Sequence, residues 1–139
     1  MAHIGTTGNK RGAALVEMAI ILTLLVILTF AVMEYGWMFF RMQQVSAAAR
    51  EGVRDAVVPD ATVADVMNTV NGLMASWGMG TTGYSVDIAP ANIEELEPGE
   101  PVTVTVAVPY GSVELLGMPE FFPTPATLTS RVVMAKEGP

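Results

Sequence analysis

Hydrophobic residues are concentrated in one stretch near the N-terminus. Residues 18–33 are apolar apart from Thr23 and Thr29, whose hydroxyls can bond back to a backbone carbonyl one helical turn earlier. A helix with no polar face must be buried on all sides or lie in a membrane. A bilayer requires about 20 apolar residues, and a chain of 139 residues is too short to enclose such a helix in its own core. We therefore expect a transmembrane helix here.

The residues that flank this span indicate its orientation. Lys10 and Arg11 precede it on a short polar segment, which favours a cytoplasmic N-terminus and an extracytoplasmic remainder. Three arginines soon after the span weaken this inference, although most of the chain beyond them is acidic. Aromatic rings prefer the headgroup level of a bilayer. The outer interface is therefore expected at a cluster of four aromatic residues, Tyr35, Trp37, Phe39 and Phe40.

Helical periodicity continues beyond the span. Apolar residues recur at a spacing of three to four through Met42, Val45, Ala49 and Val53, which predicts one long stem helix that runs to about Val57. Pro59 stops this helix. A second, amphipathic helix is expected to follow, with a capping-box-like pair at Thr62 and Asp65 and apolar positions as far as Trp77.

The periodicity then changes to two, which indicates strands at 84–88, 102–108 and 126–135. We predict an α+β protein with a long N-terminal transmembrane helix and a small head, formed by one helix on a three-stranded antiparallel sheet. The expected domains are a leader peptide (1–12), a transmembrane and extended stem helix (13–58), and an extracytoplasmic head (59–139). Phe121 and Phe122, in a proline-rich loop, are interpreted either as partner contacts or as a plug at the bottom of the sheet.

Composition excludes several classes of function. The formal net charge is -7, and eleven acidic residues against two basic ones follow Arg54, so no basic surface is present for nucleic acid. The chain has no cysteine, and its single histidine, His3, lies in the expected leader. No catalytic triad and no metal-ligand spacing can be built from these residues. We expect a protein that is not an enzyme and that needs no cofactor or metal.

The join between leader and stem is the most specific motif. Lys10, Arg11 and Gly12 are followed by Ala13 and, four residues later, by Glu17 at the start of the apolar helix. This pattern resembles the processing site of type IV pilin-like proteins. The resemblance implies that a prepilin peptidase cuts after Gly12, which would make Ala13 the new N-terminus and Glu17 the fifth mature residue.

Glu17 has two interpretations. A carboxylate inside a membrane is costly unless it is paired. Cleavage would create an α-ammonium group at Ala13, with which Glu17 of a neighbouring subunit could pair to fix the axial register of packed stems. In the alternative, Glu17 simply lies among the lipid headgroups at the first turn, where a negative charge also favours the helix dipole.

Two further blocks resemble those of TadE-like proteins, the minor pilins of the tight-adherence (Flp, type IVc) pilus. The resemblance extends over 10–58 and is weak over the head, and Met18 departs from the aromatic residue usual after the glutamate. It implies a non-enzymatic minor pilin or pseudopilin of the bacterial inner membrane, with prepilin peptidase, other pilin subunits and the pilus assembly platform as partners. The residues of these blocks are Glu34, Tyr35 and Gly36, then Arg50, Glu51, Gly52 and Arg54.

Several alternatives stay open. Arg50, Glu51, Arg54 and Asp55 form a charged cluster that is either a solvated helix face or a subunit contact just outside the membrane. The whole chain could instead be a single-pass signal-anchored protein whose extracytoplasmic head binds a partner without polymerising. A secretory signal cleaved near 47–49 is disfavoured by the length of the apolar segment. A type II secretion pseudopilin is disfavoured by Ala13, where that group usually has an aromatic residue.

Overall fold

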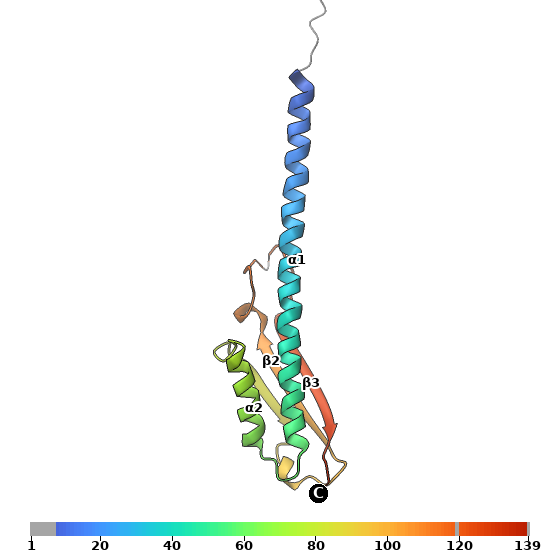
Figure 1. Ribbon diagram of the computed structural model, residues 1–139, viewed down its shortest axis with the longest axis vertical. Coiled ribbons are helices and arrows are strands. Elements are labelled where there is room, and N and C mark those ends of the chain that lie inside the picture. Colours follow the sequence, from blue (N-terminus) through green and yellow to red (C-terminus); the bar gives the residue numbers. More distant parts are fainter. Residues whose placement is uncertain (1–7, 119, 139) are drawn as a thin grey trace, which may run out of the picture.

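The computed structural model describes residues 8–118 and 120–138, with side chains from residue 12 onward. One long helix, α1 (Gly8–Val57), dominates the molecule, and a small head packs against one side of its C-terminal half (Figure 1). The 50 residues of α1 correspond to a length of about 75 Å. The first seven residues of the expected leader, His3 among them, lie outside the described residues. Residues 8–12, which we expected to precede the stem helix, are already helical.

The second helix, α2 (Val63–Ser76), begins at the predicted capping box. Thr62 Oγ1 accepts a hydrogen bond from the Asp65 backbone N–H at 3.2 Å, and Asp65 Oδ2 accepts one from the Thr62 N–H at 3.1 Å. The Thr62 hydroxyl also donates to Asp65 Oδ2 at 2.6 Å, and this bond, followed by the one from the Thr62 N–H, lowers the pKa of Asp65 because both favour the charged carboxylate. The helix ends before Gly78, whose φ of 72° is readily adopted only by glycine.

Three strands form an antiparallel sheet in the order β1-β2-β3, as the alternating segments predicted. They are β1 (Ser85–Ala89), β2 (Pro101–Pro109) and β3 (Thr127–Ala135), with short 3-10 helices η1 (Ile93–Glu95) and η2 (Tyr110–Ser112) on either side of β2. The central strand is β2. Its alternate valines, all fully buried, form one face of the core: Val102, Val104, Val106 and Val108.

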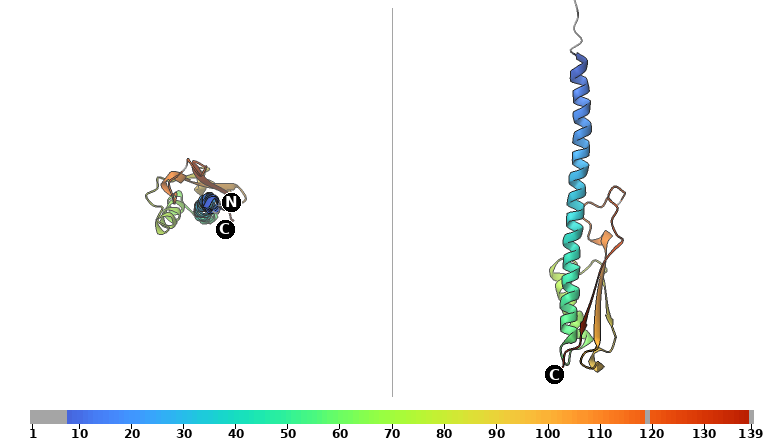
Figure 2. Two further views of the ribbon diagram at one scale, coloured as in Figure 1. Left: turned by 90° about the horizontal axis from the view of Figure 1, so that it is seen from above. Right: turned by 90° about the vertical axis from the view of Figure 1, so that its right-hand side faces the viewer.

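Both helices lie side by side on one face of the sheet (Figure 2). The prediction of an α+β head is confirmed, but the sheet is covered by two helices because the C-terminal half of α1 contributes to the core. Val45, Ala49 and Val53, three of the four residues of the predicted apolar stripe, are fully buried. The same helix is therefore an exposed rod at one end and the centre of a hydrophobic core at the other.

The end of the chain closes the head against α1. The Lys136 ammonium donates hydrogen bonds to the backbone oxygens of Ala56 at 3.2 Å and Val58 at 2.9 Å, and the Glu137 N–H donates to the Val57 oxygen at 2.9 Å. Lys136 is buried. A cation at this position satisfies carbonyls that have no partner within the helix and complements the negative end of its dipole.

Candidate functional site

The part of α1 that precedes Val26 is an apolar rod that no other part of the described chain covers. The helix is long and apolar enough to cross a membrane, with a mean hydropathy of 2.7 in its most apolar window. Leu15, Leu24 and Leu28 are more than half exposed. The Thr23 and Thr29 hydroxyls donate to the backbone oxygens of Ala19 and Leu25, each at 2.8 Å. As predicted, the span therefore presents no unsatisfied hydroxyl to lipid.

The candidate processing residues lie at the exposed end of this rod. Lys10 and Arg11 belong to α1, and Gly12, Ala13 and Glu17 are exposed on it. No heavy atom outside the local helix would lie within 4 Å of a Cβ atom added at Gly12. Among the residues whose side chains are described, none forms a hydrogen bond or ion pair with Glu17. Its carboxylate is thus free of internal partners within that part of the chain.

The second candidate block lies where the head meets the rod, and its glutamate is the most buried acidic residue of the described chain. Glu34 is only 3% exposed. Its Oε1 accepts a hydrogen bond from the Tyr110 hydroxyl, and its Oε2 accepts one from the Leu116 N–H at 2.9 Å. A buried carboxylate is tolerated only with such partners. Glu34 therefore joins the helix to a loop that follows it by about 80 residues in the sequence.

Two neighbouring side chains of α1, Tyr35 and Trp37, also form hydrogen bonds with this loop. The Tyr35 hydroxyl donates to the Pro123 backbone oxygen at 3.2 Å, and Trp37 Nε1 donates to the Val113 oxygen at 2.7 Å. Trp37 was expected to anchor the span at the lipid headgroups, but its indole N–H is engaged by the head. Gly36 is exposed, and no heavy atom would lie within 4 Å of an added Cβ atom.

Burial raises the pKa of the Tyr110 hydroxyl, and the hydrogen bond to Glu34 raises it further. Both causes favour the neutral phenol, because an ionised phenolate would be poorly solvated and would lie beside a carboxylate. Tyr110 thus remains a hydrogen-bond donor to Glu34 over the whole physiological pH range.

Arg41 connects α1 to the end of α2. Its guanidinium donates to the Trp77 backbone oxygen and to Gln44 Oε1, each at 3.0 Å. It also lies over the Trp37 ring, with 4.4 Å between Arg41 Cζ and the ring centroid. The cation–π contact with Trp37 and the hydrogen bond to the Trp77 oxygen hold the C-terminal end of α2 against α1.

The third block combines one packing residue with three exposed charges. Gly52 is buried, and a Cβ atom added there would lie 2.7 Å from Val70 Cγ2 and 3.3 Å from Val104 Cγ1. Glycine at this position therefore allows α1, α2 and β2 to pack closely. Arg50, Glu51 and Arg54 are exposed on the opposite face of α1, so they are available for contact, and Arg50 donates to Ser46 Oγ at 3.0 Å.

The two phenylalanines of the proline-rich loop, Phe121 and Phe122, differ in their exposure to solvent. Phe122 is buried and Phe121 is 71% exposed, and both line an apolar groove against Val26, Ile27 and Phe30 of α1. Of the two interpretations of the pair, this arrangement does not favour the plug at the bottom of the sheet, because the loop runs along α1 towards its N-terminal half (Figures 1 and 2). The sequence did contain one signal for this path. Glu34 lies in an apolar helix and needs a hydrogen-bond partner, which implies that a distant segment packs against α1 at this position.

Comparison with known proteins finds a family match to the stem. Residues 12–54 match the family model described as TadE-like protein. The matched range contains Gly12, Ala13, Glu17 and both further blocks of the resemblance, but not Lys10 and Arg11. It ends before α2, so it confirms the resemblance over the stem and does not include α2 or the sheet. No curated protein and no solved structure matches the chain significantly.

Proposed function

Because residues 12–54 match the TadE-like family model, we propose that this chain is a minor pilin that is processed after Gly12 and takes part in assembly of a tight-adherence pilus. The observation that carries the proposal is the contrast within α1. Its C-terminal half packs in the core of the head, whereas the part before Val26 is bare and apolar and has the exposed Gly12–Ala13 bond near its end. Such a rod is suited to a bilayer first and to packing among other stems afterwards.

We propose that the rod spans the inner membrane with its N-terminus in the cytoplasm and the head outside. Lys10 and Arg11 then lie on the cytoplasmic side, where a prepilin peptidase would hydrolyse the Gly12–Ala13 peptide bond. Hydrolysis adds one water, leaving a carboxylate on Gly12 and an amine on Ala13 that becomes protonated. Because the bond lies only about one turn inside the helix, little helical structure has to open.

Glu17 would then hold subunits in register. It follows Ala13 by four residues, which is about 6 Å along the helix axis. In a bundle of stems, the carboxylate of one copy can pair with the Ala13 ammonium group of its neighbour. Removing either charge from an apolar setting leaves the other uncompensated, which is strongly destabilising. The exposed charges at Arg50, Glu51 and Arg54 are candidates for a further subunit contact just outside the membrane.

The test combines processing with assembly. Intact mass and N-terminal sequencing, with and without a coexpressed prepilin peptidase, should give an N-terminus at Ala13 only with the peptidase, and the variant Gly12→Ala should abolish cleavage. A chain that stays intact beside an active peptidase would refute the proposal and leave a plain signal-anchored protein.

The role of Glu17 is separable from cleavage. Glu17→Ala should still be processed but should fail to copurify with pilus subunits, whereas Thr23→Ala, an exposed substitution on the same rod, should behave as the parent. Normal copurification of Glu17→Ala would refute the register role.

A further inference from the structure

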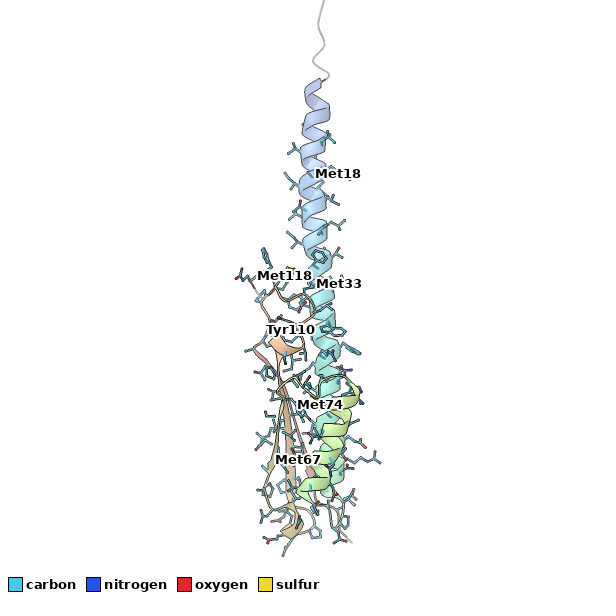
Figure 3. The ribbon with its side chains drawn as sticks, turned by 90° about the vertical axis from the view of Figure 1, so that its left-hand side faces the viewer. Met18, Met33, Met67, Met74, Tyr110 and Met118 are labelled. Atoms are coloured by element: carbon cyan, nitrogen blue, oxygen red, sulfur yellow. The ribbon has the colours of Figure 1, made fainter. Side chains whose placement is uncertain are left out.

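The loop between β2 and β3 reaches far along α1 toward its membrane end. Met118, Phe121 and Phe122 line an apolar groove with residues of α1 that belong to the span, Val26, Ile27 and Phe30. In Figure 3, Met118 lies beside α1 near the level of Met33, well beyond the end of the sheet. The head therefore extends beyond the aromatic cluster that was expected to mark its boundary with the membrane.

This loop is held at a fixed height. Three hydrogen bonds join it to one turn of α1: the Leu116 N–H donates to Glu34, the Tyr35 hydroxyl donates to the Pro123 oxygen, and the Trp37 indole N–H donates to the Val113 oxygen. Because these hydrogen bonds hold the loop at Val113 and at Pro123, the tip between them, residues 114–118 and 120–122, cannot move away from α1 independently. The position of the tip relative to the bilayer is thus set by the position of α1.

That position follows from the length of the span. The basic pair at Lys10 and Arg11 sets the inner limit of the hydrocarbon near residue 12, and about 20 residues of helix then cross it. The outer limit falls near residue 32. Val26 precedes that limit by about 9 Å, so the groove lies within the outermost part of the hydrocarbon.

The tip has side chains suited to that depth. Phe121 is 71% exposed and Leu115 is 44% exposed, and Met118 lies between them in the sequence. Glu120 is also exposed. In a dry contact with another protein, Glu120 would require a partner, whereas beside a bilayer its carboxylate can remain among hydrated headgroups while the phenyl ring enters the acyl region.

We propose that Leu115, Met118 and Phe121 form a membrane-contacting foot that enters the outer leaflet of a phospholipid bilayer beside the span. The foot gives the head a second point of contact with the membrane and so restricts rotation of the head about the axis of α1. The inference rests on the proposed insertion of α1 and adds a lipid contact made by the head itself.

The chain has no cysteine, so single cysteines can carry an environment-sensitive fluorophore at chosen sites. The full-length protein is reconstituted in phosphatidylcholine vesicles, chosen because Glu114 and Glu120 disfavour anionic lipid. Three exposed positions are labelled separately: Phe121→Cys in the foot, Leu24→Cys in the span, and Thr129→Cys on the outer face of the sheet. Lipids that carry a nitroxide near the headgroup or near the chain end report the depth of each label.

We expect a blue-shifted emission at position 121 and quenching by the shallow nitroxide several-fold stronger than at position 129. Position 24 should be quenched most by the deep nitroxide. A water-like label at 121 beside a quenched label at 24 would overturn the foot alone, and water-like labels at both would overturn membrane insertion as well. A blue shift at 121 that disappears when protein is diluted in lipid would indicate contact with a second copy and would also overturn the foot.

Discussion

Replacing Gly52 by alanine tests the packing at the centre of the head. In most exposed helical positions this change stabilises a protein by about 0.5–1 kcal/mol, because alanine loses less backbone entropy on folding. At Gly52 the new methyl carbon would lie 2.7 Å from Val70 Cγ2. Valine has one preferred rotamer in a helix and cannot turn away, so either Val70 or α2 must shift.

The magnitude follows from two opposing effects. Overpacking a core by one methyl group costs about 1–3 kcal/mol, which exceeds the gain in helix propensity, so we expect a net loss of about 1–2 kcal/mol. Gly72 is the matched control, because it is exposed on α2 and no heavy atom would lie within 4 Å of its added Cβ atom. Gly72→Ala should therefore stabilise the head by up to about 1 kcal/mol.

The assay is thermal unfolding of the full-length protein in detergent micelles, followed by near-ultraviolet circular dichroism of its tryptophans and tyrosines. For a head of this size, 1 kcal/mol corresponds to a change in Tm of about 4–8 °C. Gly52→Ala should lower Tm and Gly72→Ala should raise it. An increase of similar size for both variants would refute the close approach of α1 to α2 and β2.

Three further predictions concern the junctions of α1 with the rest of the head. Tyr110→Phe removes one of the two donors to the buried Glu34 carboxylate, so unfolding in the same micelles should show a loss of about 1–3 kcal/mol; an unchanged Tm would contradict that pairing. The raised pKa of Tyr110 means that its contribution to stability is complete below the unfolded tyrosine pKa of about 10 and is lost as pH rises above it. Stability should therefore decline more steeply above about pH 10 in the parent than in Tyr110→Phe, and parallel pH profiles would count against this reasoning. Lys136→Met leaves the Ala56 oxygen without its side-chain donor and removes one of two donors to the Val58 oxygen, the other being the Ala61 N–H. Hydrogen exchange should therefore accelerate in the last turn of α1, while equal exchange rates would show that Lys136 does not hold this end.

The sequence by itself determined both α-helices and all three strands, but not the short 3-10 helices η1 and η2. The span, the stop at Pro59, the capping box at Thr62 and the three strands all depend on local periodicity or on residues a few positions apart. The proposed processing motif at Gly12 and Glu17 is local as well, and so is the family match that covers these two residues. Local patterns suffice for these features because helix and strand periods, caps and linear motifs act over one or two turns of chain.

Only the tertiary structure decided what the polar residues inside apolar segments do. Glu34 pairs with Tyr110 across 76 positions, and Lys136 reaches the end of α1 across about 80. The requirement that a buried charge find a partner is predictable from sequence, but the partner is not, because it depends on how strands and loops return to the helix. The exposure of Phe121 beside a buried Phe122 has the same origin. Identical neighbours receive opposite environments from the path of the loop along α1.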